Sequence, residues 1–354
     1  MNSNQICYLN TASVGILNKS SIAAVHRFQE ISQTNPSTVF FEWMASGLVE
    51  LRKNIATLIH SKEHLVAFTP NFSYSLLAIT DSLRERKSKV LLYREDYPSL
   101  NMPFELGGFE VHYVDNEDGF HISIGKIREI IQSKKIEILA ISHVQFLTGF
   151  TIDLQALGQV CLEANVILIV DTTQSMGAVE IDFGDSNIDV MISSSYKWLN
   201  GGLGSAVLCV QEQFLQKFPP RIAGFGSMLH SDEGWTYSPS ITSYEPGHLN
   251  PLGLLQLGES IKERLSQSVQ AVEKHNLGLI QRLVNHLKGT PYLVDGGIEA
   301  TSLRTILCFD ASKALYDHLI TQNIITTWRK GKIRVSPHYH NTEKDIDTLT
   351  GCLL

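Results

Sequence analysis

The sequence predicts an α/β fold: a large domain with a mostly parallel sheet between helices, and a small α/β domain at the C-terminus. Short apolar runs alternate with stretches of helical periodicity from His64 to Val210. The runs are apolar along their whole length, which is typical of parallel strands covered on both faces. After Gln213 the pattern gives way to loops, long helical stretches and a second short set of strands, which indicates a separate, smaller layer.

Seven apolar runs are the predicted strands of the large sheet, and helical patterns lie between them. The clearest helical patterns cover residues 74–84 and 154–164. Asp153 stands near the N-cap position of the second, so residues 136–171 form one strand–helix–strand unit. In chain order the predicted strands are 64–68, 89–93, 110–114, 136–142, 166–171, 189–194 and 205–210.

The last third of the chain has a different composition. Residues 219–253 are rich in Gly, Pro, Ser and aromatic residues and are predicted to form long loops, whereas 251–288 is one long helical stretch or two. We place the large domain at residues 15–245 and build the small domain from residues 1–14 and 246–354. Its predicted elements are a strand at 306–309, a helix at 312–322 and a strand at 332–335.

Composition excludes several classes of protein. Hydrophobic residues make up 43% of the 354 residues, which is enough for a substantial core and excludes disorder as the main state. The formal charge is −7 and there is no long basic run, so a nucleic acid or an anionic membrane has no electrostatic support as a partner. The polar start of the chain lacks the pattern of a signal peptide, and no apolar run approaches the roughly 18 residues of a membrane helix. We therefore expect a soluble, cytoplasmic protein.

The cysteines and a histidine pair do not form a recognisable metal site. Five cysteines are scattered without C-x-x-C spacing, which is typical of reduced cytosolic thiols and not of a disulfide framework or a zinc site. His338 and His340 have the spacing H-x-H without an evident third ligand, so we interpret them as loop residues. No metal is expected.

The first candidate for chemistry is an aspartate that ends the buried run 166–171. Asp171 is followed by Gln174 and Gly177. The carboxyl ends of parallel strands are where open α/β sheets bind ligands, and a carboxylate buried there must meet a partner. Taken alone, Asp171 is equally well explained as a helix cap or as a member of a structural ion pair.

The second candidate is a lysine that follows the next predicted strand. In Ser194-Ser195-Tyr196-Lys197 the strand leads through hydroxyl residues into Lys197, and a glycine-rich turn comes next. Lysine in such a place serves as an amine nucleophile or binds phosphate. Alone it would be a surface lysine at a strand end, but Asp171 and Lys197 each end a neighbouring strand. Pyridoxal phosphate (PLP) needs this pair: the amine holds its aldehyde as a Schiff base, and the carboxylate keeps the pyridine nitrogen protonated.

With these two motifs the sequence resembles the fold-type I PLP enzymes of the aminotransferase class V group, which includes cysteine desulfurases, kynureninase and several transaminases. The resemblance extends from Tyr8-Leu9-Asn10-Thr11-Ala12 to Ile333-Arg334-Val335-Ser336-Pro337. It implies a large domain with a mostly parallel seven-stranded sheet, PLP as the cofactor, and catalysis by Lys197 with Asp171.

The resemblance assigns a phosphate site to two segments. Asn71, Phe72 and Ser73 stand before a predicted helix, whose N-terminal N–H groups suit a phosphate dianion. Ser73 as a plain helix cap is compatible with the same role. Ser194 and Tyr196 flank the lysine and are similar to further phosphate donors of the family, although Tyr196 could also be a packed tyrosine at a strand end.

The resemblance also implies contacts to the cofactor ring. Tyr97 occupies the place where the family stacks a ring on the cofactor, with a core or surface tyrosine as the alternative. Gln174 is expected to hydrogen-bond the ring hydroxyl, where kynureninase-like members have a histidine. Desulfurases and many transaminases have an asparagine that contacts the cofactor at the position of Phe146, so one contact is in doubt here. His143 is a functional residue or a structural histidine at a strand end.

The substrate side and the partners follow from the same resemblance. Arg334 matches the arginine that captures the substrate α-carboxylate, a role that its planar fork suits. Asn10 lines the substrate pocket or forms a turn. The loop around His248 is similar to the family loop that reaches the phosphate of the neighbouring subunit, which implies a homodimer with shared active sites; a solvated loop histidine is the alternative.

The reaction is chosen by elimination. Cysteine desulfurases need a thiol on a mobile loop shortly before the carboxylate-binding arginine. No cysteine lies between Asp310 and Arg334, and Cys308 belongs to an apolar run, so desulfurase activity is disfavoured. Gln174 and the short chain weigh against a kynureninase-like Cβ–Cγ lyase. We therefore favour an aminotransferase that acts on amino acids and keto acids.

Three alternatives remain. The kynureninase-like Cβ–Cγ lyase keeps support from the similarity of residues 144–149 and 194–199 to that enzyme. An amino-acid epimerase would use nearly the same residues. A non-catalytic protein with the same scaffold is the alternative from another class, and the presence of both Lys197 and Asp171 argues against it.

Overall fold

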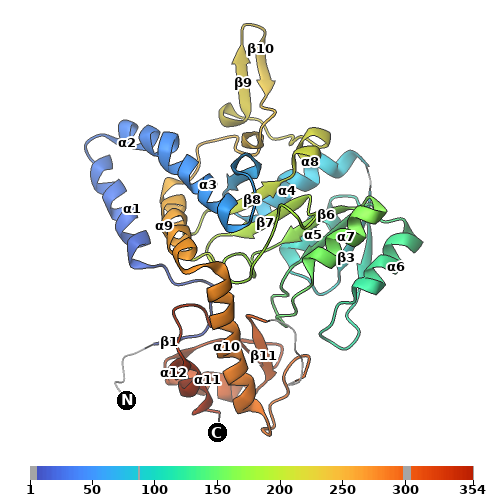
Figure 1. The fold of residues 1–354 in the computed structure, drawn as a ribbon, viewed down its shortest axis with the longest axis vertical. Coiled ribbons are helices and arrows are strands. Elements are labelled where there is room, and N and C mark those ends of the chain that lie inside the picture. Colours follow the sequence, from blue (N-terminus) through green and yellow to red (C-terminus); the bar gives the residue numbers. More distant parts are fainter. Residues whose placement is uncertain (1–5, 87, 298–303, 354) are drawn as a thin grey trace.

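The centre of the molecule is a seven-stranded sheet with the order β2-β8-β7-β6-β5-β3-β4 (Figure 1). The computed structural model describes residues 6–86, 88–297 and 304–353. Strand β8 is antiparallel to both of its neighbours, and the other pairs are parallel, which confirms the predicted mostly parallel sheet. The strands are β2 Val66–Thr69, β3 Lys89–Tyr93, β4 Glu110–Val114, β5 Ile138–Ser142, β6 Ile167–Asp171, β7 Val190–Ser194 and β8 Ala206–Val210.

The sheet is apolar on both faces because each face carries its own hydrophobic core. Successive residues of a strand point to opposite sides, so Leu168 and Val170 join one core and Ile169 joins the other. Each fully buried aliphatic side chain of this kind contributes roughly 1.5–3 kcal/mol to folding. The continuous apolar runs in the sequence are explained by this double burial.

Helices cover both faces of the sheet. One face is covered by α4, α5 and α8, which contribute residues such as Leu76, Phe104 and Phe214 to that core. The other face is covered by α3, α6, α7 and α9. Their bounds are α3 Leu48–Leu58, α4 Phe72–Leu83, α5 Pro98–Leu106, α6 Ile124–Lys134, α7 Leu154–Ala164, α8 Glu212–Lys217 and α9 Pro251–Gln267.

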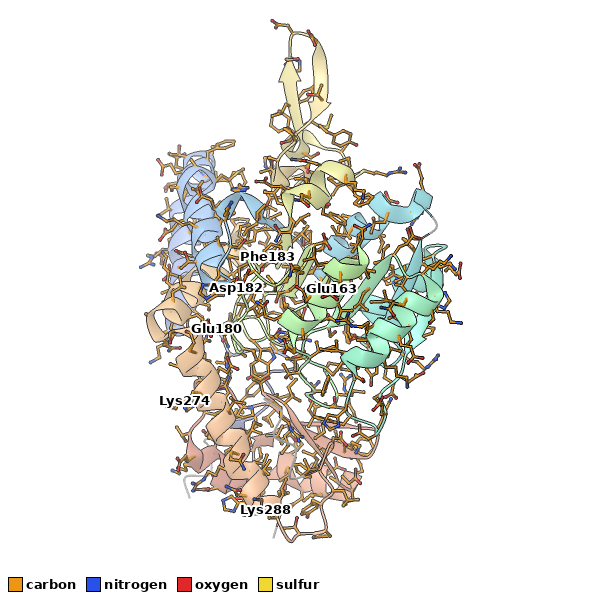
Figure 2. The ribbon with its side chains drawn as sticks, turned by 45° about the vertical axis from the view of Figure 1, so that its right-hand side comes forward. Glu163, Glu180, Asp182, Phe183, Lys274 and Lys288 are labelled. Atoms are coloured by element: carbon orange, nitrogen blue, oxygen red, sulfur yellow. The ribbon has the colours of Figure 1, made fainter. Side chains whose placement is uncertain are left out.

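A three-stranded antiparallel sheet with the order β11-β14-β13 lies at the end of the molecule that holds both chain termini (Figure 1). Its core includes residues of α10, α11 and α12. Figure 2 labels Lys274 on α10 and Lys288 just after the end of this helix, beside the small sheet. The bounds are α10 Val269–Leu287, β11 Leu307–Asp310, α11 Lys313–Thr321, β13 Thr327–Arg329, β14 Lys332–Val335 and α12 Glu343–Thr350.

The N-terminal segment lies against the small sheet region. Strand β1, Cys7–Tyr8, pairs in parallel with β12, Ile324–Ile325. Helices α1, Lys19–Ser32, and α2, Pro36–Glu42, then lead through a π-helical turn into α3. The domain boundaries at 15–245 and 246–354 stay a prediction.

One region differs from the expectation, and another decides between two expected arrangements. Residues 219–253, predicted as loops, contain a hairpin of β9, Met228–Ser231, and β10, Gly234–Tyr237, which projects from the molecule in Figure 1. Most of its residues are exposed, so no buried alternation marks it in the sequence. The long helical stretch is two helices, α9 and α10, separated at Ser268, whose φ of 63° breaks the helix.

No helix among the residues described has the length and apolarity to cross a bilayer.

Candidate active site

A cavity lies where the central strands of the large sheet end. Asp171 ends β6, and Lys197 follows β7 three residues after that strand ends at Ser194. The topology therefore brings the two predicted catalytic side chains into one cavity, at the strand edge where α/β sheets bind ligands. The cavity is lined by Phe72, Tyr97, Ser142, Phe146, Asp171, Thr173, Gln174, Ser194, Tyr196 and Lys197.

The turn that carries Lys197 is anchored by backbone contacts. The Ser195 hydroxyl donates to the carbonyls of Gly202 and Ser205, at 2.9 and 2.7 Å. On the other side, the Gly15 N–H donates to the Tyr196 carbonyl at 2.8 Å, and a Cβ at Gly15 would lie 2.0 Å from the Lys197 oxygen. Glycine is required there because the N-terminal segment passes so close to the lysine turn.

Asp171 is a buried carboxylate with one backbone partner. The Thr173 N–H donates to its Oδ1 at 2.8 Å. Burial raises the pKa of Asp171 to about 6; the hydrogen bond from Thr173 and the charge of Lys197 oppose this shift, and the charge of Asp96 adds to it. A carboxylate in this environment gains from a cationic N–H partner within the cavity.

Lys197 has an amine that burial makes reactive. Its Nζ lies 5.5 Å from the ring centroid of Tyr97 and 5.8 Å from that of Tyr196. Burial lowers the pKa of Lys197 to about 8; Asp171 opposes the shift, and the charges of Arg334 and Arg329 increase it. None of the carboxylates described here lies within ion-pair distance of this amine. Much of it is therefore neutral and nucleophilic near pH 8.

The N-terminus of α4 opens beside the cavity. Asn71 caps this helix, because its Oδ1 accepts the Tyr74 N–H at 3.0 Å. The N–H groups of Phe72 and Ser73 lie in the first turn of the helix, where no carbonyl of the helix itself can accept them. They are therefore available to an anion. Phe72 lines the cavity, whereas Asn71 and Ser73 are exposed beside it. Ser194 and Tyr196 line the cavity itself.

Asp96 is a buried carboxylate that the sequence analysis did not identify. It accepts hydrogen bonds from the Ser142 N–H (2.8 Å), the Ser142 hydroxyl (2.5 Å), the Tyr97 N–H (2.7 Å) and the Gln145 amide (3.3 Å). All four groups donate, which satisfies the ionised form although burial raises the pKa of Asp96. Because Ser142 is the register partner of Asp171, Asp96 fixes the loop of Tyr97 next to that strand end.

The predicted ring contacts are placed as follows. Gln174 lines the cavity and is oriented by two partners: its Nε2 donates to the Ala12 carbonyl at 3.1 Å, and its Oε1 accepts from Trp198 Nε1 at 2.7 Å. One N–H of the Gln174 amide remains available to a ligand. Tyr97 and Phe146 meet edge to face, with ring centroids 5.2 Å apart. His143 does not line the cavity, and burial lowers its pKa to about 4.

Arg334 presents a buried positive charge that has no acidic partner among the residues described. It lies on β14 and is 3% exposed. Its Nη1 donates to the Phe146 carbonyl at 2.7 Å and its Nη2 to the Ser13 hydroxyl at 2.8 Å, while its Nε has no hydrogen-bond partner. Burial lowers the pKa of Arg334 to about 10. An uncompensated buried guanidinium is costly, so this one is suited to receive a carboxylate.

Asn10 and His248 do not line the cavity of the same chain. Asn10 Oδ1 accepts the Ser13 hydroxyl at 2.9 Å, so Asn10 acts on the site through Ser13 and Arg334. His248 is exposed, with its ring centroid 5.3 Å from that of Phe40. Its expected contact with a neighbouring subunit stays a prediction. Within residues 6–86, 88–297 and 304–353, no group of three or more His, Cys, Asp or Glu side chains is placed to hold a metal ion.

Comparison with known proteins decides the family. The sequence model of the aminotransferase class-V family matches residues 7–349. This chain belongs to the aminotransferase class-V family. Family membership confirms the resemblance noted in the sequence, the fold-type I architecture and the predicted cofactor class, PLP.

Individual relatives are distant. A probable cysteine desulfurase of Methanothermobacter thermautotrophicus is 22% identical over 331 residues, which cover 85% of this chain and 82% of that protein. The uncharacterized aminotransferase YcbU of Bacillus subtilis is also 22% identical, over 83% of this chain and 80% of its own length.

Solved structures with the same fold include a cysteine desulfurase of Thermococcus onnurineus, with a TM-score of 0.86, 20% identity, and coverage of 99% of this chain and 94% of that one. The cystine C–S lyase C-DES also has a TM-score of 0.86, with 19% identity over 99% of this chain and 97% of its own. At these identities the likeness establishes the fold and leaves the reaction open.

Proposed function

We propose that this protein is a PLP-dependent aminotransferase that acts on an amino acid. The observation that carries the proposal is the burial of the Lys197 amine and the Asp171 carboxylate in one cavity, with a buried and unpaired arginine beside it. When bound, PLP supplies an aldehyde that condenses with amines and a ring that withdraws electrons from the substrate α-carbon.

The residues of the cavity fit this cofactor group by group. The N–H groups at the start of α4 and the hydroxyls of Ser194 and Tyr196 would hold the phosphate. Asp171 would hold the proton on the pyridine nitrogen, and the free N–H of Gln174 would bind the ring hydroxyl. Tyr97, whose loop is fixed by Asp96, would stack on the ring.

Lys197 is the group that moves a proton. Its Nζ, which is partly neutral near pH 8, would accept the proton from the substrate α-carbon, and the protonated amine would then return it. Arg334 holds the substrate by its α-carboxylate with two parallel hydrogen bonds, which fixes the α-carbon relative to Lys197. Phe146 lies over the same space and excludes water from it.

The hairpin of β13 and β14 supports transamination over cysteine desulfuration. Only Lys330 and Gly331 separate Arg329 from Lys332, and both turn residues have positive φ, 50° and 77°. This tight turn leaves no room for a mobile loop with a thiol shortly before Arg334. Cys308 is buried, its thiol donates to the Leu147 carbonyl, and burial raises its pKa to about 12, so it is a poor nucleophile.

We also propose a homodimer with shared active sites. The support is the exposure of His248 on a loop away from the cavity of its own chain, where it is free to reach a second copy. Determination of the mass in solution tests the dimer, and His248→Ala is then expected to weaken PLP binding without changing that mass.

The reaction is tested with purified holoenzyme and single amino acids, each offered with pyruvate or 2-oxoglutarate. A new amino acid formed together with a new keto acid supports the proposal, and Lys197→Ala is the control that should form neither. Alanine and sulfur released from cysteine without any keto acid would establish a desulfurase instead.

The same samples separate the remaining reactions. Pyruvate and ammonia without an amino acceptor indicate Cβ elimination, and alanine with anthranilate from kynurenine indicates the Cβ–Cγ lyase. A racemised substrate without amino transfer indicates an epimerase. A protein that stays colourless with added PLP would favour a non-catalytic scaffold.

A further inference from the structure

One face of the small sheet carries a cluster of charged residues directed at the active site. Opposite residues of antiparallel strands share a face, and so do residues two apart on one strand. Arg334 lies opposite Cys308 on β11 and opposite Thr327 on β13, and Lys332 lies opposite Asp310 and Arg329. We call the face formed by these residues the arginine face: Cys308, Asp310, Thr327, Arg329, Lys332 and Arg334.

The arginine face borders a second cavity, larger than the first, with about 1370 Å³ of open space. Both Arg329 and Arg334 line it, and Leu147 and Thr148 form part of the opposite side. Arg334 joins the two cavities, because it donates to the carbonyl of Phe146, whose side chain lines the first one. A substrate with its α-carboxylate on Arg334 would therefore extend its side chain along this face.

The cations on the arginine face differ in their partners. Lys332 is neutralised by Asp295 and Asp310, with Nζ–O distances of 2.5 and 2.8 Å. Arg329 and Arg334 have no acidic partner among the residues that the structure describes, and neither forms an ion pair with Asp295 or Asp310. The two guanidinium groups are thus left to anions that come from outside the chain.

The acidic residues on the other side of this cavity have partners of their own. Glu95 accepts from the Tyr93 hydroxyl and the Asn116 amide, at 3.4 and 3.3 Å. Asp118 is paired with His121 and accepts its N–H and that of Phe120. Both residues line the same cavity as Arg329, and neither forms an ion pair with it among the residues that the structure describes.

Arg329 is close enough to the reacting groups to act on a substrate. Burial is the largest cause that lowers the pKa of Lys197 and of Arg334, and the positive charge of Arg329 lowers both pKa values further. In the register of the sheet it is the diagonal neighbour of Arg334, and diagonal neighbours are about 7–8 Å apart. The tight turn at Lys330 and Gly331 holds it in this place. Two arginines at this spacing match the two carboxylates of a short dicarboxylic amino acid.

We propose that Arg329 is a specificity residue that binds the distal carboxylate, and that the substrates are acidic amino acids such as glutamate or aspartate. The inference rests on the proposed function, because it assigns the α-carboxylate to Arg334. Neutral amides of the same length, glutamine and asparagine, fit the same space and lack the second charge, so they are discriminated against by the charge alone.

The kinetic test compares variants of the protein with two amino donors, one charged and one neutral. The holoenzyme is assayed with glutamate and with glutamine as amino donors, in the wild type, Arg329→Gln and Lys344→Gln. Arg329→Gln is expected to lower kcat/KM for glutamate by about 10- to 100-fold, the effect of one lost charge-assisted pair, and to leave the value for glutamine nearly unchanged. Lys344→Gln removes the same charge from an exposed position on α12, outside both cavities, and is expected to change neither value. Equal losses with both donors in Arg329→Gln would overturn the proposal.

Binding tests the same residue without turnover. Calorimetry with succinate and with propionate is expected to show that the wild-type holoenzyme binds the diacid about 10-fold or more tightly, and that Arg329→Gln abolishes this preference. A preference that persists in Arg329→Gln, or none in the wild type, would contradict the role of Arg329. If no donor is transaminated but succinate binds through Arg329, the proposed function fails and the specificity site stands. If the enzyme transaminates but prefers neutral donors, the proposed function stands and the role of Arg329 fails.

Discussion

The active site has two sides that are built differently. The cofactor side, formed by Asp96, Asp171 and Lys197, lies at the ends of parallel strands of the large sheet, and its fixed charges are mostly negative. The arginine face lies on an antiparallel sheet of the small layer, and Arg329 and Arg334 on it have no acidic partner in the described part of the chain. In the proposed function each side matches one part of the chemistry: anions face the cationic ring, and cations face the carboxylates of the substrate.

The two sides also differ in how they respond to loss of a residue. In the proposed function, Lys197 carries out the chemistry itself, Arg334 positions the substrate, and Asp96 acts through other residues. If the division into sides is right, mutations on the cofactor side change cofactor binding and its spectrum, whereas mutations on the arginine face change substrate binding and leave the spectrum intact.

The largest effect is expected for Lys197→Ala. Loss of the general base and of the covalent anchor should lower kcat by about 10³-fold or more, because proton transfer and covalent catalysis are both removed. The measurement is single-turnover kinetics with the variant reconstituted with excess PLP. Lys344→Ala, which changes an exposed lysine on α12 outside both cavities, is the matched control. Activity within a few-fold of wild type in Lys197→Ala would break the assignment of the cofactor side.

The next effect is expected for Arg334→Gln. It removes the charged partner of the α-carboxylate and should lower kcat/KM by about 10²-fold for every amino donor, since hydrogen bonds to charged groups contribute roughly 1.5–3 kcal/mol each. The absorbance of the bound cofactor should not change. A shifted cofactor band in this variant would mean that Arg334 belongs to the cofactor side.

Asp171 is expected to change how the stability of the cofactor-free protein depends on pH. Its pKa in the folded state is raised from 3.8 to about 6, so folding favours the protonated form. The resulting stabilisation is present below the unfolded pKa and is lost as the pH rises through about 6. Asp171→Asn, which cannot ionise, is therefore expected to match the wild type near pH 4 and to become more stable than it by up to about 3 kcal/mol above pH 7.

Urea unfolding of the two proteins across this pH range measures the difference. Glu95→Gln, a substitution of an exposed carboxylate, provides the control for the loss of a carboxyl group as such. A difference between Asp171→Asn and wild type that does not depend on pH would contradict the burial of the ionised group.

A smaller effect is expected for Asp96→Asn. The change keeps the shape but turns one acceptor into a donor that faces the donors Ser142 and Tyr97, so the loop of Tyr97 should loosen. PLP affinity is expected to fall about 10-fold, with a shifted cofactor absorbance, while KM for the amino acid changes little. Glu95→Gln is again the control. If Asp96→Asn alters only the thermal stability and leaves the spectrum as it was, Asp96 is structural and does not position Tyr97.

The cofactor side could be predicted from the sequence to a large extent. Asp171 and Lys197 follow apolar runs, and the bounds of β3, β4, α7 and β14 agree with the predicted ranges 89–93, 110–114, 154–164 and 332–335. Double burial makes such strands continuous in hydrophobicity, and the parallel topology then gathers their ends at one edge.

The remaining features depend on contacts between distant segments. Asp96 acquires its role from Ser142, which is 46 residues away in the chain. Asn10 was expected to line the pocket, and it contacts the site through Ser13 instead, because β1 pairs with β12 and sets that distance. The arginine face exists only through the register of β11, β13 and β14, so Arg329 could not be singled out from its neighbours in the sequence. The exposed β9–β10 hairpin carries no buried alternation that would have marked it.

The most direct test of the account is to locate the lysine that holds PLP. The holoenzyme is reduced with borohydride, digested and analysed by mass spectrometry, with a sample in which Asp171 is changed to Ala alongside. We expect the pyridoxyl group on Lys197, with a much lower yield in the Asp171→Ala sample because the ring is no longer held. A pyridoxyl group on another lysine, or equal labelling of several surface lysines, would contradict the central claim that the buried Lys197 and Asp171 together hold PLP.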